Sequence, residues 1–136
     1  MCGMKTRMLA VLVVILSFLL LHGQATYDFP STSGNTFVSV CSVIEKKPET
    51  RLDAANIMSC ISFVEGVVEG IGLGVKYAEG IAGRKLYHPF CIPEDASKGQ
   101  LVIVVLKFIR NHQEKAPAPS YLLVTESLTA AFPCKE

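Results

Sequence analysis

Four cysteines are spread over the chain after its apolar N-terminus, and their number and spacing restrict the folds open to it. They are Cys41, Cys60, Cys91 and Cys134. No two of them form a CxxC pair, so the spacing does not favour a zinc site. An even number of cysteines in a small exported chain predicts two disulfides, with four buried free thiols as the alternative.

The expectation of export rests on residues 1–25, which have the three-part layout of a signal peptide. Basic Lys5 and Arg7 precede an apolar run from Met8 to Leu21, and small Gly23 and Ala25 follow. We place cleavage after Ala25, which also removes the fifth cysteine. A permanent transmembrane anchor is the alternative, but a run of about 14 residues is shorter than the roughly 20 that span a bilayer. We therefore expect no membrane attachment after cleavage.

The remaining chain of roughly 110 residues is long enough for one domain and too short for two. We assign residues 26–33 to a flexible N-terminal segment and residues 34–136 to the domain. The whole chain has 13 Lys and Arg against 12 Asp and Glu, without a basic run. This balance argues against nucleic acid as a partner.

Apolar residues recur at helical spacing in four segments of the domain. The first segment runs from Gly34 to about Glu45, and the second begins with Asp53 as a candidate N-cap. The third follows Asp95 or Ser97 and ends by 111–112; we prefer helix to strand there because the helical spacing continues to Ile109. The fourth ends before Pro133. These segments predict an all-α fold, a small four-helix up-and-down bundle with two disulfides.

Three glycines of the second segment, Gly66, Gly70 and Gly74, lie four residues apart on nearly one helical face. A glycine inside a helix costs roughly 1 kcal/mol relative to alanine. We therefore expect either a neighbouring helix backbone packed closely against this face or a bend near Gly72.

The bundle topology also predicts how the cysteines pair. Cys41 ends the first helix and Cys60 lies near the start of the second, so both adjoin one turn. Cys91 precedes the third helix and Cys134 follows the fourth, which places both at the opposite end. We predict the pairs Cys41 with Cys60 and Cys91 with Cys134, with the other two connectivities as alternatives.

A Cys/His nucleophile is the most plausible enzymatic arrangement, because His88, Cys91 and Asp95 lie close together in sequence. A catalytic thiol must stay reduced, however, and pairing explains these cysteines better. We predict no catalytic residues, no metal and no cofactor, and hence no enzyme. The candidate partner-binding residues lie in loops, where protein contacts are common, with ordinary surface as the alternative: Arg84, Lys85, Tyr87, His88 and His112.

Five short motifs occur in order along almost the whole domain. They are CISFVEGVVEG (60–70), FCIP (90–93), QLVIVV (100–105), FIRNH (108–112) and AAFPC (130–134). As an ordered set they resemble the Rap/Tai family of type VI secretion immunity proteins.

The resemblance implies a helical periplasmic protein that binds and blocks a type VI secretion effector, a toxin that is typically a peptidoglycan amidase. Family members characteristically occlude the active-site cleft of the toxin, and some are dimers, so a homodimer is a further expectation. The functional residues do not transfer, because no motif marks them. The alternative function is a periplasmic chaperone or stress protein of the small disulfide-linked helical type.

Overall fold

The computed structural model describes residues 29–30 and 32–134. Within these residues the chain forms four α-helices and two short 3-10 helices, and it contains no strand. The predicted all-α class with four helices is therefore confirmed. The predicted signal peptide lies outside the described residues, as do residues 26–28 and 31 of the segment 26–33.

The longest helix, α3, spans Arg51–Ala82, and its first turn is closed by a capping box. The Thr50 hydroxyl accepts a hydrogen bond from the Asp53 N–H at 3.0 Å, and the Asp53 carboxylate accepts one from the Thr50 N–H at 2.8 Å. The prediction that Asp53 is the N-cap is therefore wrong. Thr50 takes that position because its hydroxyl accepts a hydrogen bond from a free N–H of the first turn. Asp53, the third residue of the helix, accepts in turn from the Thr50 N–H.

The later helices begin and end close to their predicted limits. Helix α4 spans Lys98–Asn111 and starts at Ser97, one of the two predicted caps, whose hydroxyl accepts from the Gln100 N–H. Residues 101–106 are helical, as preferred over a strand. Helix α5 spans Ser120–Ala131 and ends before Pro133.

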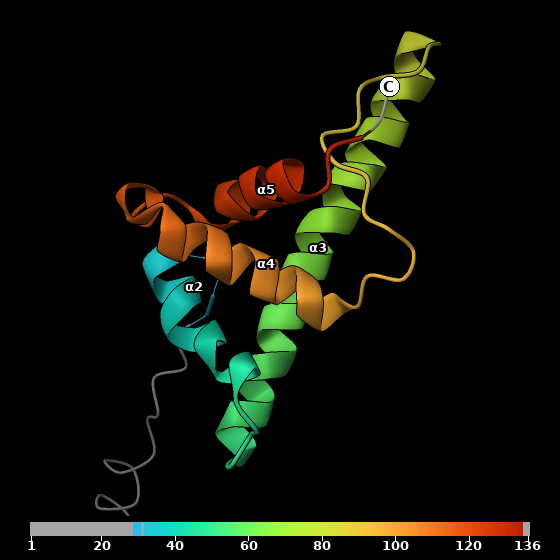
Figure 1. The fold of residues 1–136 in the computed structure, drawn as a ribbon. Coiled ribbons are helices and arrows are strands. Elements are labelled where there is room, and N and C mark those ends of the chain that lie inside the picture. The colour runs from blue at the N-terminus through green and yellow to red at the C-terminus, as the bar shows by residue number, and fades with distance from the viewer. Residues whose placement is uncertain (1–28, 31, 135–136) are drawn as a thin grey trace, which may run out of the picture.

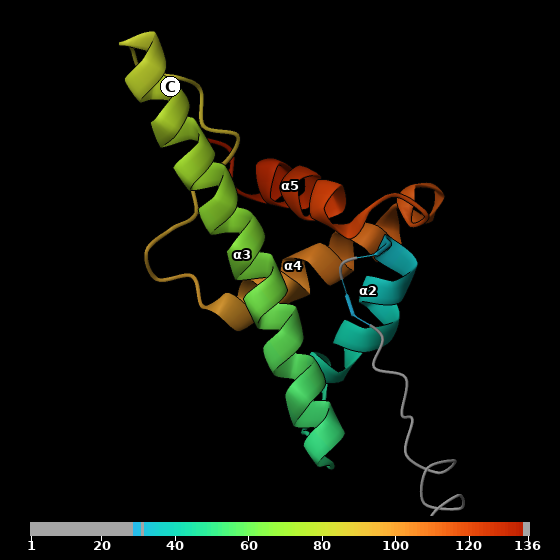
Figure 2. The ribbon, with the colours of Figure 1, turned by 180° about the vertical axis from the view of Figure 1, so that it is seen from behind.

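Three shorter helices pack against the middle of α3 (Figure 1 and Figure 2). They are α2 (Gly34–Cys41), α4 and α5; the 3-10 helix η1 (Ser42–Glu45) continues α2, and η2 (Gln113–Lys115) joins α4 to α5. Their apolar faces meet in one core. Its largest fully buried side chains include Phe37, Val64, Leu106, Ile109, Leu123 and Leu128. Both ends of α3 extend beyond this core.

The start of α2 is held tightly by the connection between α4 and α5. The Gly34 and Asn35 N–H groups donate to the carbonyl oxygens of Ala118 and Ala116, both at 3.0 Å. A Cβ added at Gly34 would collide with the Leu123 side chain and lie 2.9 Å from the Ala116 oxygen. Glycine is therefore required here for close packing.

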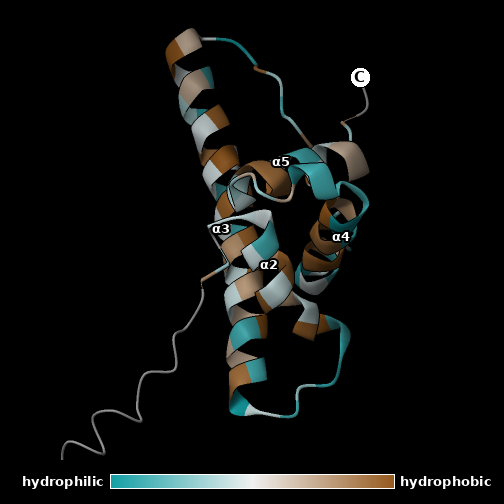
Figure 3. Cartoon of the chain, turned by 90° about the vertical axis from the view of Figure 1, so that its left-hand side faces the viewer, coloured by the Kyte–Doolittle hydropathy of each residue, from teal (hydrophilic) through white to brown (hydrophobic). Residues whose placement is uncertain are grey.

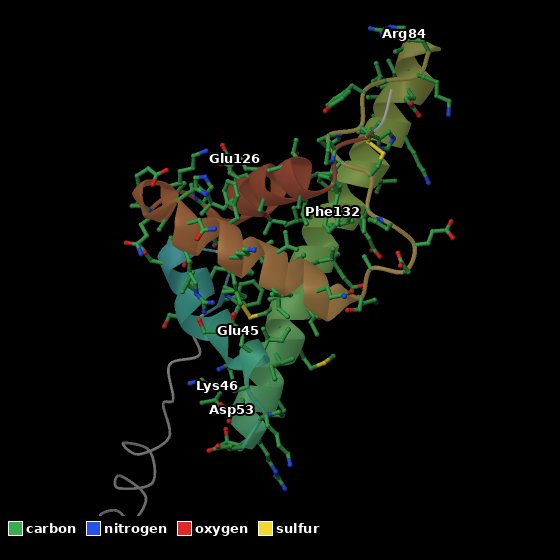
Figure 4. The ribbon with its side chains drawn as sticks, viewed as in Figure 1. Glu45, Lys46, Asp53, Arg84, Glu126 and Phe132 are labelled. Atoms are coloured by element: carbon green, nitrogen blue, oxygen red, sulfur yellow. A yellow bond between two sulfur atoms is a disulfide. The ribbon has the colours of Figure 1, made fainter. Side chains whose placement is uncertain are left out.

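The structure contains the two predicted disulfides. Cys41 at the end of α2 is bonded to Cys60 in α3, and Cys91 before α4 is bonded to Cys134 after α5. Figure 4 shows the two bonds in yellow, one above and one below α4 in that view.

Ion pairs connect α4 to its neighbours. Arg110 donates to both carboxylate oxygens of Glu45, at 2.7 and 2.8 Å, and also to the Ser42 hydroxyl at 2.9 Å. This contact lowers the pKa of Glu45, chiefly through the Arg110 hydrogen bond. Lys98 pairs with Glu65 of α3, and this pairing raises the pKa of Lys98. Each pair is exposed, so each contributes only modestly to stability.

Candidate protein-binding surface

Large apolar side chains are exposed at the C-terminal end of α3 and in the loop that follows. Leu73, Tyr77 and Ile81 are 71%, 72% and 74% exposed, and Tyr87 is 75% exposed. The first three are four residues apart and therefore share one helical face. Figure 3 shows apolar residues in brown along α3 up to its tip. We call these four side chains the α3 tip surface.

This surface is unusual because α3 is apolar on two opposite faces. Val64 and its neighbours at helical spacing face the core, whereas Leu73, Tyr77 and Ile81 lie on the other side of the helix. A helix with an apolar stripe normally buries it. Clustered exposed apolar side chains on a soluble domain mark an interaction site.

The exposed charged side chains around the tip surface are mostly basic, with Glu69 as an exposed carboxylate four residues before Leu73. Lys76, Arg84 and Lys85 are exposed, and Figure 4 places Arg84 at the tip of α3. The nearby carboxylate of Glu79 is half-buried and accepts a hydrogen bond from the Leu86 N–H at 2.9 Å. The surface therefore suits a partner that offers apolar pockets with an acidic rim.

The loop that carries Tyr87 is fixed at both ends. Gly83 ends α3 with a φ of 63°, a left-handed conformation that glycine adopts without strain. Further on, Phe90 is buried, the Cys91 N–H donates to the Phe132 oxygen at 2.8 Å, and Cys91 is bonded to Cys134. These anchors hold Tyr87 beside the end of α3.

The structure brings four of the five predicted contact residues together and separates the fifth. Arg84, Lys85 and Tyr87 are exposed in this loop, and His88 is half-buried there. His112 instead caps the far end of α4, at the opposite side of the molecule (Figure 1 and Figure 2). Its Nδ1 lies 2.8 Å from the Phe108 oxygen and its ring stacks on Phe108. His112 thus has a structural role in ending α4.

Sequence reasoning missed Leu73, Tyr77 and Ile81. They recur every four residues, but the core-facing stripe of the same helix already explained why the segment is apolar. A second stripe on the opposite face was the signal that could have identified them.

The glycine face of α3 is open, which corrects the expectation for Gly66, Gly70 and Gly74. A Cβ added at any of them, or at Gly72, would meet nothing within 4 Å, and α3 runs without interruption through all of them. A closely packed helix neighbour therefore does not explain these glycines, while the expected bend near Gly72 stays a prediction. Next to Gly66, a depression is lined by Phe29, Met58, Ser59, Ser62, Phe63 and Val67.

By length and composition α3 could also cross a membrane, since an 18-residue window has a mean hydropathy of 1.5. One such helix is weak evidence, because mostly buried core helices pass the same test, although only 11% of this window is buried. Here α3 supplies Cys60 and Val64 to the core and is paired through Glu65 with α4. These contacts make it the central helix of the domain.

Two alternatives to protein binding were a Cys/His nucleophile near Cys91 and a metal site. Cys91 is bonded to Cys134, so the His88, Cys91 and Asp95 arrangement holds no free thiol. Across the part of the chain that the structure describes, no three His, Cys, Asp or Glu side chains form a cluster that could hold a metal ion.

These features define a class: a disulfide-linked helical domain with an exposed apolar surface suited to binding another protein. The family model of the Rap1a immunity proteins matches residues 33–134, and the chain therefore belongs to the Rap1a immunity protein family. Neither a curated protein nor a solved structure matches it. Membership confirms the family resemblance and makes the chain an immunity protein for a secreted effector, with a role in binding rather than catalysis.

Proposed function

We propose that this protein acts in the periplasm, where it binds a type VI secretion effector with peptidoglycan amidase activity and blocks its active-site cleft. The family match over residues 33–134 carries the proposal. The exposed apolar end of α3 supports it, because a protein that neutralises a toxin needs a surface available for tight binding. The signal-peptide pattern of residues 1–25 and the two disulfides support an oxidising compartment outside the cytoplasm.

We assign effector binding to the α3 tip surface. Protection against a lytic enzyme requires a dissociation constant of about 1 nM or lower, about −12 kcal/mol. A few buried aromatic anchors supply most of such an energy, and tyrosine is among the commonest. Tyr77 and Tyr87 are the large aromatic side chains exposed here, and the basic Arg84 and Lys85 adjoin them at the rim.

The test is rescue of cells that export a candidate amidase to the periplasm. The wild-type chain should restore growth, and calorimetry with the purified amidase should give nanomolar binding. Tyr77→Ala should weaken binding at least 30-fold, corresponding to about 2 kcal/mol. Tyr121→Ala is the matched control, because Tyr121 is 52% exposed on α5, away from the tip. Equal losses for both variants would refute the surface assignment.

Failure of the wild-type chain to rescue cells and to form a complex with every candidate amidase would refute the amidase proposal. Protection of unrelated proteins from acid-induced aggregation would instead favour the chaperone alternative. Location is tested separately, by osmotic-shock release of the tagged chain together with removal of residues 1–25.

We further propose that two copies pair through the open glycine face of α3. Gly66 and Gly70 would let a second helix approach closely, and exposed Met58 lines the depression beside Gly66. Sedimentation equilibrium of the purified chain should show a dimer. A monomer at high micromolar concentration would contradict this part of the proposal and leave effector binding unaffected.

A further inference from the structure

The two disulfides differ sharply in burial. Cys41 and Cys60 are fully buried in the core, whereas Cys91 is exposed and Cys134 is half-buried. Thiol–disulfide exchange requires a thiolate to reach one sulfur of the bond, so access controls its rate. In the folded protein, an external dithiol can approach Cys91 and cannot approach the core pair without unfolding.

The two bonds also hold different parts of the molecule. The Cys41–Cys60 bond joins α2 to α3, which are packed together through Phe37 and Phe63 as well. The Cys91–Cys134 bond joins the connection between α3 and α4 to the segment after α5. Near this second bond, the other links are the Cys91 N–H to the Phe132 oxygen, the Cys134 sulfur 3.6 Å from the His88 oxygen, and the side chains of Phe90, Ile92 and Ala96 on the core. Opening it therefore releases a loop and leaves the helix packing in place.

That loop carries Tyr87 and the basic residues Arg84 and Lys85. Residues 83–97 contain no helix, and few hydrogen bonds tie them to the rest of the domain. A segment of this kind opens locally at a small fraction of the global unfolding free energy. On the side of Tyr87 toward α4, its covalent attachment is through Cys91, whereas on the other side the Leu86 N–H is bonded to Glu79 of α3.

We propose that the Cys91–Cys134 bond is a redox modification site, opened by a dithiol reductant or oxidoreductase, that controls the conformation of the loop 83–97. A thiolate of the dithiol attacks the Cys91 sulfur, forms a mixed disulfide and releases Cys134 as a thiolate, which takes up a proton. The second thiol of the reductant then displaces Cys91, so that the reductant leaves as a disulfide and Cys91 leaves as a thiol. Two electrons pass from the dithiol to the protein, and the core disulfide stays intact.

Timed alkylation of the folded chain tests the site directly. The full mature protein is incubated with dithiothreitol, quenched with N-ethylmaleimide and mapped by peptide mass spectrometry. Cys91 and Cys134 should be labelled at least tenfold faster than Cys41 and Cys60, and the two rates should converge in guanidinium. Equal rates in the folded protein, or earlier labelling of Cys41 and Cys60, would overturn the proposal.

A second measurement tests the structural consequence without a variant. After selective opening, hydrogen exchange should accelerate at least tenfold in residues 83–97 and remain unchanged in α4, with the far-ultraviolet circular dichroism preserved. Accelerated exchange throughout α4 would mean that the bond stabilises the whole fold, which would refute the proposal that it restrains only the loop 83–97.

The effect on binding rests on the proposed function. The protein opened at Cys91–Cys134, and the variant Cys91→Ala with Cys134→Ala, should bind the amidase at least tenfold more weakly than the oxidised chain. Unchanged affinity would refute control of the binding loop. If the oxidised chain binds no amidase, the proposed function fails, whereas the order of alkylation still decides the redox site.

Discussion

Replacing the glycines of the open α3 face by alanine should stabilise the monomeric protein. Gly66, Gly70 and Gly74 are exposed, helical and free of neighbours within 4 Å of an added Cβ. Each Gly→Ala change removes backbone entropy from the unfolded chain and adds about 1 kcal/mol of stability. The three sites are neighbours at a spacing of four residues, so their gains add only approximately, and the triple variant should gain up to about 3 kcal/mol.

Urea unfolding followed by circular dichroism at low micromolar concentration measures this gain. With a slope of about 1.5 kcal/mol per M, a gain of 3 kcal/mol raises the unfolding midpoint by about 2 M. Two glycines with different surroundings provide matched controls. Gly34→Ala should destabilise by roughly 1 to 3 kcal/mol, because the added Cβ strikes Leu123 and the Ala116 backbone.

The second control is Gly83→Ala, which should cost about 1 kcal/mol because the φ of 63° is strained for alanine. A triple variant at Gly66, Gly70 and Gly74 that unfolds at lower urea than wild type would refute the reasoning. A loss of stability that grows with protein concentration would show that a second copy covers this face, because the added methyl groups would then weaken the dimer.

Three further changes test the core, the α3 cap and the α4 ion pair. Phe37→Ala should lower the free energy of unfolding by about 3 to 5 kcal/mol, since Phe37 is fully buried, and urea unfolding measures it. Asp53→Asn should destabilise at pH 7, and this loss should shrink as the pH falls through the lowered folded-state pKa of Asp53. Hydrogen bonds from Thr50 lower the pKa of Asp53, so its stabilisation exists above the unfolded pKa and is lost as the pH falls through the folded pKa. Thermal melts across this range measure it, and an unchanged difference at low pH would contradict it. Arg110→Lys should cost about 0.5 to 1 kcal/mol, because lysine lacks the planar fork with which Arg110 reaches both carboxylate oxygens of Glu45 and the Ser42 hydroxyl; no measurable loss in a melt at low salt would show that the pair contributes nothing.

Much of the fold could be predicted from the sequence because its determinants are local. Helical periodicity located all four helices. The positions of the cysteines at the helix ends favoured pairing Cys41 with Cys60 and Cys91 with Cys134 over the two other connectivities, and the structure contains these pairs. The Thr50 cap was missed because Asp53 also has the chemistry of a cap, and only the backbone geometry decides between the two positions.

The candidate surface was less predictable, because it depends on what the folded chain leaves uncovered. The spacing of Gly66, Gly70 and Gly74 identifies a face but not whether another helix lies against it. The same limit applies to His112. Its sequence position in a polar turn suggested contact with a partner, whereas its ring stacks on the ring of Phe108 in the same chain.

The length of α3 has a mechanical consequence. Its 32 residues extend about 48 Å, against about 21 Å for the 14 residues of α4, so the three shorter helices brace only its middle. The last turns rely on their own backbone hydrogen bonds, which the glycines weaken. These last turns can therefore bend to fit a bound partner, while the middle of α3, packed against the other helices, keeps its conformation. The conformational entropy that these turns lose on binding lowers the affinity. In return, the turns can accommodate differences in shape between partner surfaces.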